Sequence, residues 1–297
     1  MHPFLYRKYG FMGSREDYAT ADFVLFGNPM DFTVSFQPGS RFGPQAIRAV
    51  SDGLEEYSFY QRRSLLDVRF FDAGDVDLPF GNTTASLERI EDVARKIHKD
   101  GKLPIAMGGE HLVTLPLVKA ALAQYPRLAV FHFDAHADLR EDYLGETLSH
   151  ATVMRQVVNL VGGKNLYQFG IRSGTEEEYA YGRNNTHFYV DELLEPLQRV
   201  VEQWDDTPVY VTIDIDVVDP AFAPGTGTPE PGGCTAKEIL QAMLVLTRLP
   251  VVGMDLVEVL PAQDSSQRTA LLAAKLIREA LAGLKPLQET FDNGRDL

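Results

Sequence analysis

Short apolar runs rich in Val, Ile, Phe and Tyr recur along this chain and alternate with stretches of helical spacing. Because a run that is apolar at nearly every position suits a strand buried on both faces, each run is predicted to be a strand of a parallel sheet. The eight runs begin at Asp22, Val68, Leu103, Leu128, Leu166, His187, Val209 and Val251. Helical spacing is found over residues 86–98, 113–123, 191–201, 236–246 and 270–281. This alternation predicts an α/β fold.

Two helix starts carry a Thr-x-x-Glu capping box. Thr175 pairs with Glu178 and Thr235 with Glu238, so that each side chain can satisfy a free backbone amide of a first turn. No linker rich in Pro, Gly and Ser divides the chain, and it has no internal repeat. We therefore predict a single domain over residues 1–297, with roughly the first 20 residues as a surface arm.

Composition and charge exclude several classes of protein. Hydrophobic residues make up 44% of the chain and charged residues 24%, which is typical of a globular protein and argues against disorder. The net charge of −14 disfavours nucleic acid and anionic membranes as partners and attracts small cations. No run approaches the ~18 apolar residues of a membrane span and no signal peptide is recognisable, so a cytoplasmic location is expected. The one cysteine, Cys234, excludes an internal disulfide and a thiolate metal cluster.

The residues able to carry chemistry gather where predicted strands end. In parallel α/β sheets, ligands bind at the carboxyl ends of the strands. Side chains at positions i, i+2 and i+4 of an extended segment project to one side, so residues spaced in this way can converge on one cavity. The candidates are His111 after the third run, Asp134, His136 and Asp138 after the fourth, and Asp214 and Asp216 at the end of the seventh.

Charge balance predicts that these residues hold metal ions. Four carboxylates at the ends of buried strands repel one another, and unpaired buried charge is too costly to retain. Two divalent cations would balance the four aspartates and leave two neutral imidazoles as further ligands. Oxygen ligands with a minority of imidazoles favour manganese or a similar ion over zinc, cobalt or iron.

Neighbouring residues admit two interpretations each. His132 fits a hydrogen-bonded core histidine better than a ligand, and Asp219, which precedes Pro220, fits a turn better than a ligand. Glu110 is interpreted as an orienting partner of a ligand histidine. The glycine-rich segments 38–44 and 224–233 match no phosphate-binding fingerprint, and each forms either a tight turn or a loop that lines the substrate site.

Five segments resemble the ureohydrolase family of arginases and agmatinases, and agmatinases most of all. They are GGEH from Gly108, FDAHAD from Phe133, SHAT from Ser149, DIDVVDPAFAPGTGTPEPGG from Asp214 and EVLP from Glu258. The resemblance implies a three-layer α/β/α domain with a mostly parallel eight-stranded sheet, assembled as a trimer or hexamer. It also implies two manganese ions per chain.

The roles of the candidates follow from the same resemblance. His111 and Asp138 would complete the site of one ion, His136 and Asp216 that of the other, and Asp134 and Asp214 would bridge the two. The expected reaction is hydrolysis of a guanidino compound by metal-bound hydroxide.

Three further residues would serve the substrate. The resemblance implies that His150 shuttles a proton to the leaving amine and that Glu258 binds the guanidinium by charge-assisted hydrogen bonds. Thr228 would line the same pocket. The alternatives are a solvent-exposed structural histidine at His150 and a surface ion-pair partner at Glu258.

The loop between Asp138 and His150 bears on the substrate. Arginine-specific members of the family carry an Asn-, Thr- and Ser-rich loop here, whereas this chain has Glu141, Asp142 and Glu146. Because such a loop suits a distal ammonium better than a carboxylate, agmatine, hydrolysed to putrescine and urea, is the expected substrate. Guanidinobutyrate, aminopropyl-agmatine and arginine remain alternatives, as do a catalytically silent binding or assembly module and a different dinuclear-metal hydrolase.

Overall fold

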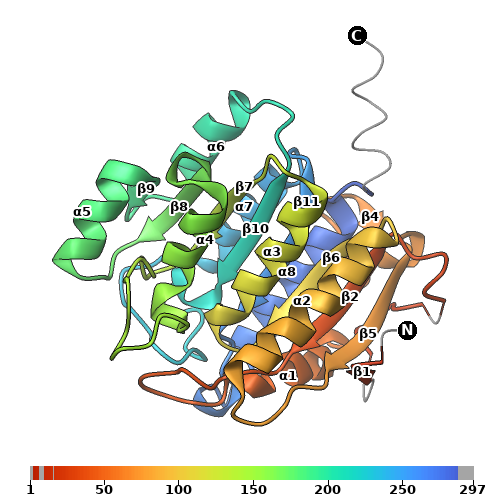
Figure 1. The fold of residues 1–297 in the computed structure, drawn as a ribbon. Coiled ribbons are helices and arrows are strands. Elements are labelled where there is room, and N and C mark those ends of the chain that lie inside the picture. Colours follow the sequence, from red (N-terminus) through yellow and green to blue (C-terminus); the bar gives the residue numbers. More distant parts are fainter. Residues whose placement is uncertain (1–2, 7–9, 16, 287–297) are drawn as a thin grey trace.

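A nine-stranded sheet forms the centre of the chain in this computed structural model, which describes residues 3–6, 10–15 and 17–286 (Figure 1). The order of the strands is β1 (Leu5–Tyr6), β5 (Phe70–Val76), β2 (Phe23–Asn28), β6 (Leu103–Gly108), β11 (Val251–Val257), β10 (Val209–Asp214), β7 (Ala129–Phe133), β8 (Leu166–Ile171) and β9 (His187–Val190). The eight predicted strands are all present and all parallel. Only β1, which pairs antiparallel with β5, was not predicted.

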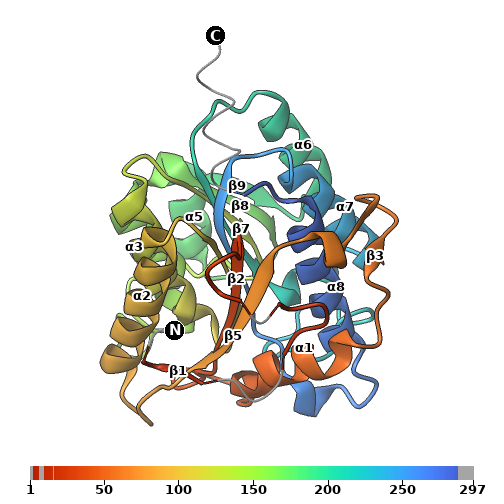
Figure 2. The ribbon, with the colours of Figure 1, turned by 90° about the vertical axis from the view of Figure 1, so that its right-hand side faces the viewer.

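Helices cover both faces of the sheet and give three layers (Figure 2). One face is covered by α2 (Thr83–Lys99), α3 (Thr114–Gln124) and α4 (Val153–Val161), which contact one another in this order. The other face is covered by α1 (Gly43–Ser51), α8 (Arg268–Gly283), α7 (Ala236–Leu246) and α6 (Leu194–Glu202), while α5 (Glu176–Asn185) contacts β9. The predicted α/β/α fold is therefore confirmed. Among the described residues, no helix is long and apolar enough to cross a membrane.

Both predicted capping boxes are present at helix starts. Thr175 Oγ1 accepts a hydrogen bond from Glu178 N at 3.2 Å, and Glu178 Oε2 accepts one from Thr175 N at 2.8 Å. Thr235 and Glu238 make the equivalent pair at the start of α7. Sequence patterns missed α1, α4 and a short hairpin formed by β3 (Tyr57–Ser58) and β4 (Arg63–Ser64).

The glycine-rich segment 38–44 serves packing rather than the substrate site. Gly39 N donates to Asp31 Oδ2 at 2.8 Å, and α1 begins at Gly43 with a proline in its first turn, where the fixed φ of proline suits a helix. A Cβ at Gly43 would lie 2.7 Å from the backbone oxygen of Val259. The glycine therefore allows α1 to approach the loop that follows β11.

The start of the chain contributes to the core. Leu5–Tyr6 forms β1, and the side chains of Phe11 and Met12 are buried. The predicted surface arm falls partly on residues 1–2, 7–9 and 16, outside the described residues, and it stays a prediction. The single-domain organisation of residues 1–297 also stays a prediction.

A buried ion-pair cluster joins α1 to β5, and we expect its loss to destabilise the fold. Arg48 binds Asp72 through Nε–Oδ2 at 2.8 Å and Asp75 through a contact of 2.5 Å. Arg48→Met would leave the buried Asp72 carboxylate without its cation, which should lower the free energy of unfolding by about 3–5 kcal/mol. Urea denaturation measures this change. The exposed pair of Arg95 and Glu91 is the control, because Arg95→Met should cost only about 0.3–0.5 kcal/mol. Equal losses in the two variants would contradict the prediction.

Candidate metal centre

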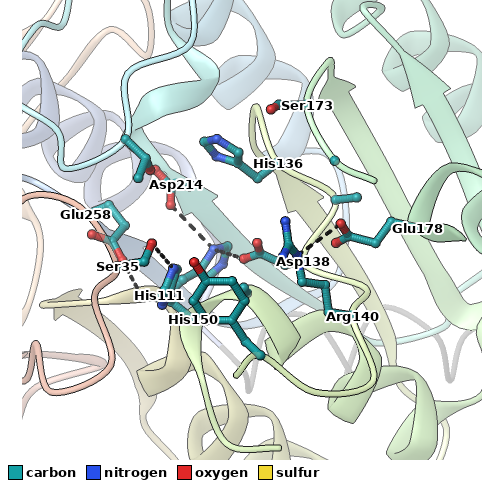
Figure 3. A pocket seen from close by; sticks show the side chains of 15 residues that line it. Ser35, His111, His136, Asp138, Arg140, His150, Ser173, Glu178, Asp214 and Glu258 are labelled. Carbon is teal, nitrogen blue, oxygen red and sulfur yellow. Dashed lines mark hydrogen bonds and ion pairs between the residues drawn. The ribbon is translucent and has the colours of Figure 1, made fainter. Parts of the chain in front are cut away.

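The six predicted ligands lie at the carboxyl ends of neighbouring strands in the middle of the sheet. Figure 3 shows four of them, His111, His136, Asp138 and Asp214. They are His111 just after β6, Asp134, His136 and Asp138 after β7, Asp214 at the last position of β10, and Asp216 in the short 3-10 helix that follows it. The strands β6, β11, β10 and β7 are adjacent in this order and parallel, so their carboxyl ends share one edge of the sheet.

One group of ligand atoms surrounds His111. Its Nδ1 lies 3.0 Å from Asp134 Oδ2, 3.2 Å from Asp138 Oδ2 and 3.5 Å from Asp214 Oδ2. Despite these short distances, the buried Nδ1 has no partner in a hydrogen-bonding direction. An imidazole nitrogen and three carboxylate oxygens that converge without hydrogen-bonding one another are arranged as ligands of a shared cation.

A second group adjoins the first through Asp134. His136 Nδ1 lies 2.9 Å from Asp216 Oδ2 and 3.5 Å from Asp134 Oδ1. The two oxygens of Asp134 therefore face different histidines, with Oδ2 toward His111 and Oδ1 toward His136. This is the placement that a bridging carboxylate needs.

The electrostatics of the cluster also fit divalent cations. The four aspartates are buried. Burial and the neighbouring Asp134 raise the pKa of Asp138 to about 7. Burial, with Asp216 and Asp134 close by, raises the pKa of Asp214 well above its ordinary value. A cation among these carboxyl groups would stabilise their ionised forms and remove this cost.

A hydrogen-bonded chain behind His111 fixes the orientation of its ring. His111 Nε2 lies 3.0 Å from Thr212 Oγ1, and Thr212 in turn donates to Asp255 Oδ1 at 2.6 Å. Tyr210 donates to the other oxygen of Asp255 at 2.7 Å. Sequence reasoning missed these partners, although an aspartate inside the apolar run from Val251 was a usable signal. Such outer partners orient a ligand histidine and tune its basicity.

His132 acts as a support of the cluster in the same way. Its Nε2 lies 2.8 Å from Asp134 Oδ2, and its Nδ1 lies 3.1 Å from Gln168 Nε2. The Nε2 atom is close enough to His111, Asp134 and Asp138 to belong to a possible ligand group. Because both ring nitrogens already have partners, the interpretation as a hydrogen-bonded core histidine fits better.

Arg172 holds the loop that carries Asp216. Its guanidinium donates to the backbone oxygens of Asp216 at 2.7 Å, Val217 at 3.2 Å and Glu230 at 2.6 Å. One side chain thus ties the 3-10 helix after β10 to the glycine-rich segment 224–233. No sequence pattern singled out this arginine, since its partners are distant backbone atoms.

A cavity of about 270 Å³ opens over the ligand cluster. The three residues that the resemblance assigned to the substrate, His150, Glu258 and Thr228, all line it. Figure 3 shows His150 and Glu258. Glu258 Oε1 accepts a hydrogen bond from His111 N at 2.7 Å, and Thr228 Oγ1 lies 3.5 Å from Asp216 Oδ2. Burial and the nearby Glu110 raise the pKa of Glu258 to about 8, so this carboxyl group also lies in surroundings that favour a cationic partner.

Two residues of the site have a strained backbone. Asp138 has a φ of 52° and Glu258 a φ of 62°, in the left-handed region that residues other than glycine seldom adopt. Glu258 N is held in this conformation by a hydrogen bond to Gly109 O at 2.9 Å. A Cβ at Gly109 would lie 1.9 Å from Met30 O, so only glycine fits there. Strain of this kind is concentrated at functional sites, where surrounding contacts enforce it.

The acidic side chains of the loop between Asp138 and His150 do not face the cavity, contrary to the expectation from the sequence. Glu141 instead pairs with Arg155, and Asp142 Oδ1 accepts from Gly145 N at 3.0 Å. Glu141, Asp142 and Glu146 are all absent from the lining of the cavity. Besides Glu258, the carboxylate that lines it beyond the ligand cluster is Glu178 of α5, which lies 3.3 Å from Arg140 Nε. The expectation that the acidic loop receives the distal ammonium is therefore wrong, because its acidic side chains are exposed and lie outside the cavity lining.

Two other expectations have clear outcomes. Asp219 is a turn residue, since its carboxylate accepts from Ala221 N at 2.8 Å and Gly232 N at 2.7 Å. The expectation for Glu110 was wrong, because its Oε2 accepts from Thr33 N at 2.7 Å and not from a ligand histidine.

Burial raises the pKa of the Cys234 thiol to about 12, in keeping with an unreactive side chain.

Known proteins resemble the chain over most of its length. The model of the Arginase family matches residues 21–283. An agmatinase of Bacillus subtilis is 54% identical over 276 residues, which cover 92% of this chain and 95% of that protein. An agmatinase of Bacillus anthracis is 51% identical, with coverage of 92% and 95%.

Solved structures share the fold. The agmatine ureohydrolase of Thermoplasma volcanium has a TM-score of 0.85 at 31% identity, with 98% of this chain and 97% of that chain covered. The proclavaminate amidino hydrolase of Streptomyces clavuligerus also has a TM-score of 0.85 at 31% identity, with coverage of 96% and 99%.

Proposed function

Because this chain belongs to the arginase family, we propose that it is a dinuclear metal hydrolase that converts agmatine and water to putrescine and urea. The observation that carries the proposal is the pair of buried ligand groups, joined by Asp134, beneath a cavity lined by Glu258 and His150. The identity with the two Bacillus agmatinases supports the choice of substrate.

We assign the ligands as the sequence resemblance implied. His111 and Asp138 would hold one ion, His136 and Asp216 would hold the other, and Asp134 and Asp214 would be shared between the two sites. The donor set holds carboxylate oxygens and two imidazoles, with no thiolate, which suits Mn²⁺. Two such ions would supply the Lewis acidity that generates a nucleophile from water at neutral pH.

The substrate guanidinium is placed by Glu258 in this proposal. Its carboxylate lies beside the ligand cluster, with Oε1 already held by His111 N, so its position relative to the metals is fixed. A planar guanidinium can donate two parallel hydrogen bonds to a carboxylate, which orients the carbon that is attacked. Thr228 adds a hydroxyl on the side of Asp216.

His150 is assigned the transfer of a proton to the leaving nitrogen. The leaving nitrogen carries one hydrogen in the guanidinium and three in the product ammonium, so it gains the two protons of the attacking water. His150 Nε2 lies 3.3 Å from Ser35 Oγ in the cavity lining, and this ring nitrogen can take up one proton and pass it to the departing amine. Burial lowers the pKa of His150 to about 4, so the ring is neutral at neutral pH before the reaction.

Glu178 and Arg140, rather than the acids of the loop, line the cavity away from Glu258. Glu178 is buried, and its two oxygens accept from Leu139 N at 3.0 Å and from Thr175 N at 2.8 Å. Arg140 Nε lies 3.3 Å from the same carboxylate, so the pair carries no excess negative charge. The preference for agmatine therefore rests on the relatives.

The alternatives to agmatine hydrolysis come from the other activities of the family. One protein of the same fold is a proclavaminate amidino hydrolase, which keeps guanidino compounds other than agmatine as alternatives. Guanidinobutyrate, aminopropyl-agmatine and arginine are therefore the competing substrates, and a silent binding module is the alternative of another class. Assembly as a trimer or hexamer and a cytoplasmic location stay predictions from the sequence.

A substrate panel tests the proposal directly. The purified protein is stripped of metal, reloaded with Mn²⁺ and assayed for urea release from agmatine, arginine and 4-guanidinobutyrate, with the stripped protein as control. We expect metal-dependent urea from agmatine and far less from the two acids, because the Bacillus relatives that are 54% and 51% identical are agmatinases. Preference for 4-guanidinobutyrate would overturn the choice of substrate, and no urea from any compound would favour the silent module.

A further inference from the structure

His150 is held by a set of hydroxyl groups on three sides. Its backbone N donates to Thr33 Oγ1 at 3.0 Å, and its ring Nδ1 lies 3.4 Å from the same oxygen. Ser149 Oγ lies 3.3 Å from Nδ1, and Ser35 Oγ lies 3.3 Å from Nε2. Catalytic hydrogen bonds are often this long before the substrate binds.

The single proton of the Thr33 hydroxyl is already donated to Glu110. Thr33 Oγ1 donates to Glu110 Oε2 at 3.0 Å, and the same carboxylate oxygen accepts from Thr33 N at 2.7 Å. Glu110 is buried, and its position just before His111 anchors it to the end of β6. Glu110 Oε2 thus accepts from both the backbone N and the hydroxyl of Thr33.

The lone pairs of Thr33 Oγ1 determine which hydrogen bond this oxygen can make with the ring of His150. A hydroxyl oxygen has two lone pairs, and one of them accepts from His150 N. The other faces Nδ1 and can only accept. A neutral imidazole bonded to an acceptor at Nδ1 must carry its hydrogen there, which leaves the lone pair on Nε2.

We propose that Thr33 is a positioning residue that fixes His150 as the Nδ1–H tautomer, with the basic Nε2 directed into the cavity. Glu110, Thr33 and His150 then form one chain of hydrogen bonds that starts beside the ligand His111. This inference rests on the proposed function, in which Nε2 accepts a proton during the reaction and donates it to the leaving nitrogen.

Ser149 is the competing influence on the tautomer. Its hydroxyl accepts from Ala151 N at 3.3 Å as the cap of a short 3-10 helix, and its proton could be donated to Nδ1. That arrangement would give the opposite tautomer. If Ser149 were decisive, loss of the Thr33 hydroxyl would leave the reaction rate unchanged.

Three variants of Thr33 provide the test in the Mn²⁺-loaded enzyme with agmatine. Thr33→Val keeps the shape and removes the hydroxyl, Thr33→Ala also removes it with less steric demand, and Thr33→Ser retains it. Proton transfer by a positioned side chain is worth about 10²–10⁴-fold in rate, so misdirecting the ring should lower kcat by about 10- to 100-fold in Thr33→Val and Thr33→Ala. KM and metal content should stay within about 2-fold, and Thr33→Ser should recover most of kcat.

Two controls separate positioning from general damage. Thr247→Val removes a partly buried hydroxyl that donates to Leu244 O, remote from the cavity lining, and should leave kcat unchanged. In a double-mutant cycle, Thr33→Val should slow the His150→Ala enzyme no further, because the ring that Thr33 directs is already gone.

The outcomes are distinct from those that test the proposed function. An unchanged kcat in Thr33→Val, failure of Thr33→Ser to restore it, or additive losses in the double variant would each overturn the role of Thr33. Absence of urea from the unmodified, metal-loaded protein would instead reject the proposed function itself.

Discussion

Asp134→Ala is expected to remove both metal ions and nearly all urea release. Its two carboxylate oxygens face His111 at 3.0 Å and His136 at 3.5 Å, so one side chain serves both ligand groups. Loss of a residue that merely orients a metal ligand costs about 10- to 100-fold in metal affinity, and loss of a shared ligand should cost more than about 100-fold. Metal content after dialysis and the rate of urea release at saturating agmatine measure the two effects.

The matched control for this variant is Asp142→Ala. Asp142 belongs to the same loop region, but it accepts from Gly145 N and does not line the cavity. We expect unchanged metal content and activity there. If Asp134→Ala retained two ions per chain, the assignment of Asp134 as a bridging ligand would be wrong.

The second large effect is expected for Glu258→Gln, which should weaken substrate binding while both ions remain. A glutamine oxygen can still accept from His111 N, as Glu258 Oε1 does at 2.7 Å, so the geometry at the ligand cluster is preserved. What is lost is the negative charge that pairs with the guanidinium. Hydrogen bonds to charged groups contribute about 1.5–3 kcal/mol, so kcat/KM for agmatine should fall by about 10- to 100-fold.

Metal analysis and a competition experiment complete this measurement. The variant should bind the same amount of Mn²⁺ as the unmodified protein, while a guanidinium competitor such as guanidine should inhibit it less. Substrate affinity equal to that of the unmodified enzyme would contradict the proposed role of Glu258. Loss of metal would show instead that the side chain supports His111.

The fold was predictable because its signals are local. Seven of the eight parallel strands are buried at all or all but one of their positions and therefore appear in the sequence as nearly continuous apolar runs, whereas the edge strand β9 is only partly buried. The starts of α5 and α7 are marked by a threonine and a glutamate three positions apart. Elements with weaker sequence patterns were not predicted. The helix α1 begins with a glycine and a proline, which are typical of a turn, and β1 is only two residues long.

The candidate ligands were also predictable, for a related reason. Asp134, His136 and Asp138 lie two residues apart on one segment, and their spacing alone brings them to one side. The structure gathers these residues with His111, Asp214 and Asp216, and their roles as ligands stay a prediction that the metal measurements will decide. His132 was likewise separable from the ligands by its depth in the strand.

By itself, the sequence determined the α/β class, the eight strands, the candidate ligands and the family resemblance, because all of these follow from short-range periodicity and from compact motifs. Only the tertiary structure decided the order of the strands, the outward direction of Glu141 and Asp142, and the partners Thr33, Glu178 and Asp255. Each of these depends on the approach of segments far apart in the chain, as when Thr33 meets His150 across 117 positions. The direction of a side chain in a loop is set by such contacts, and residue type alone does not encode it.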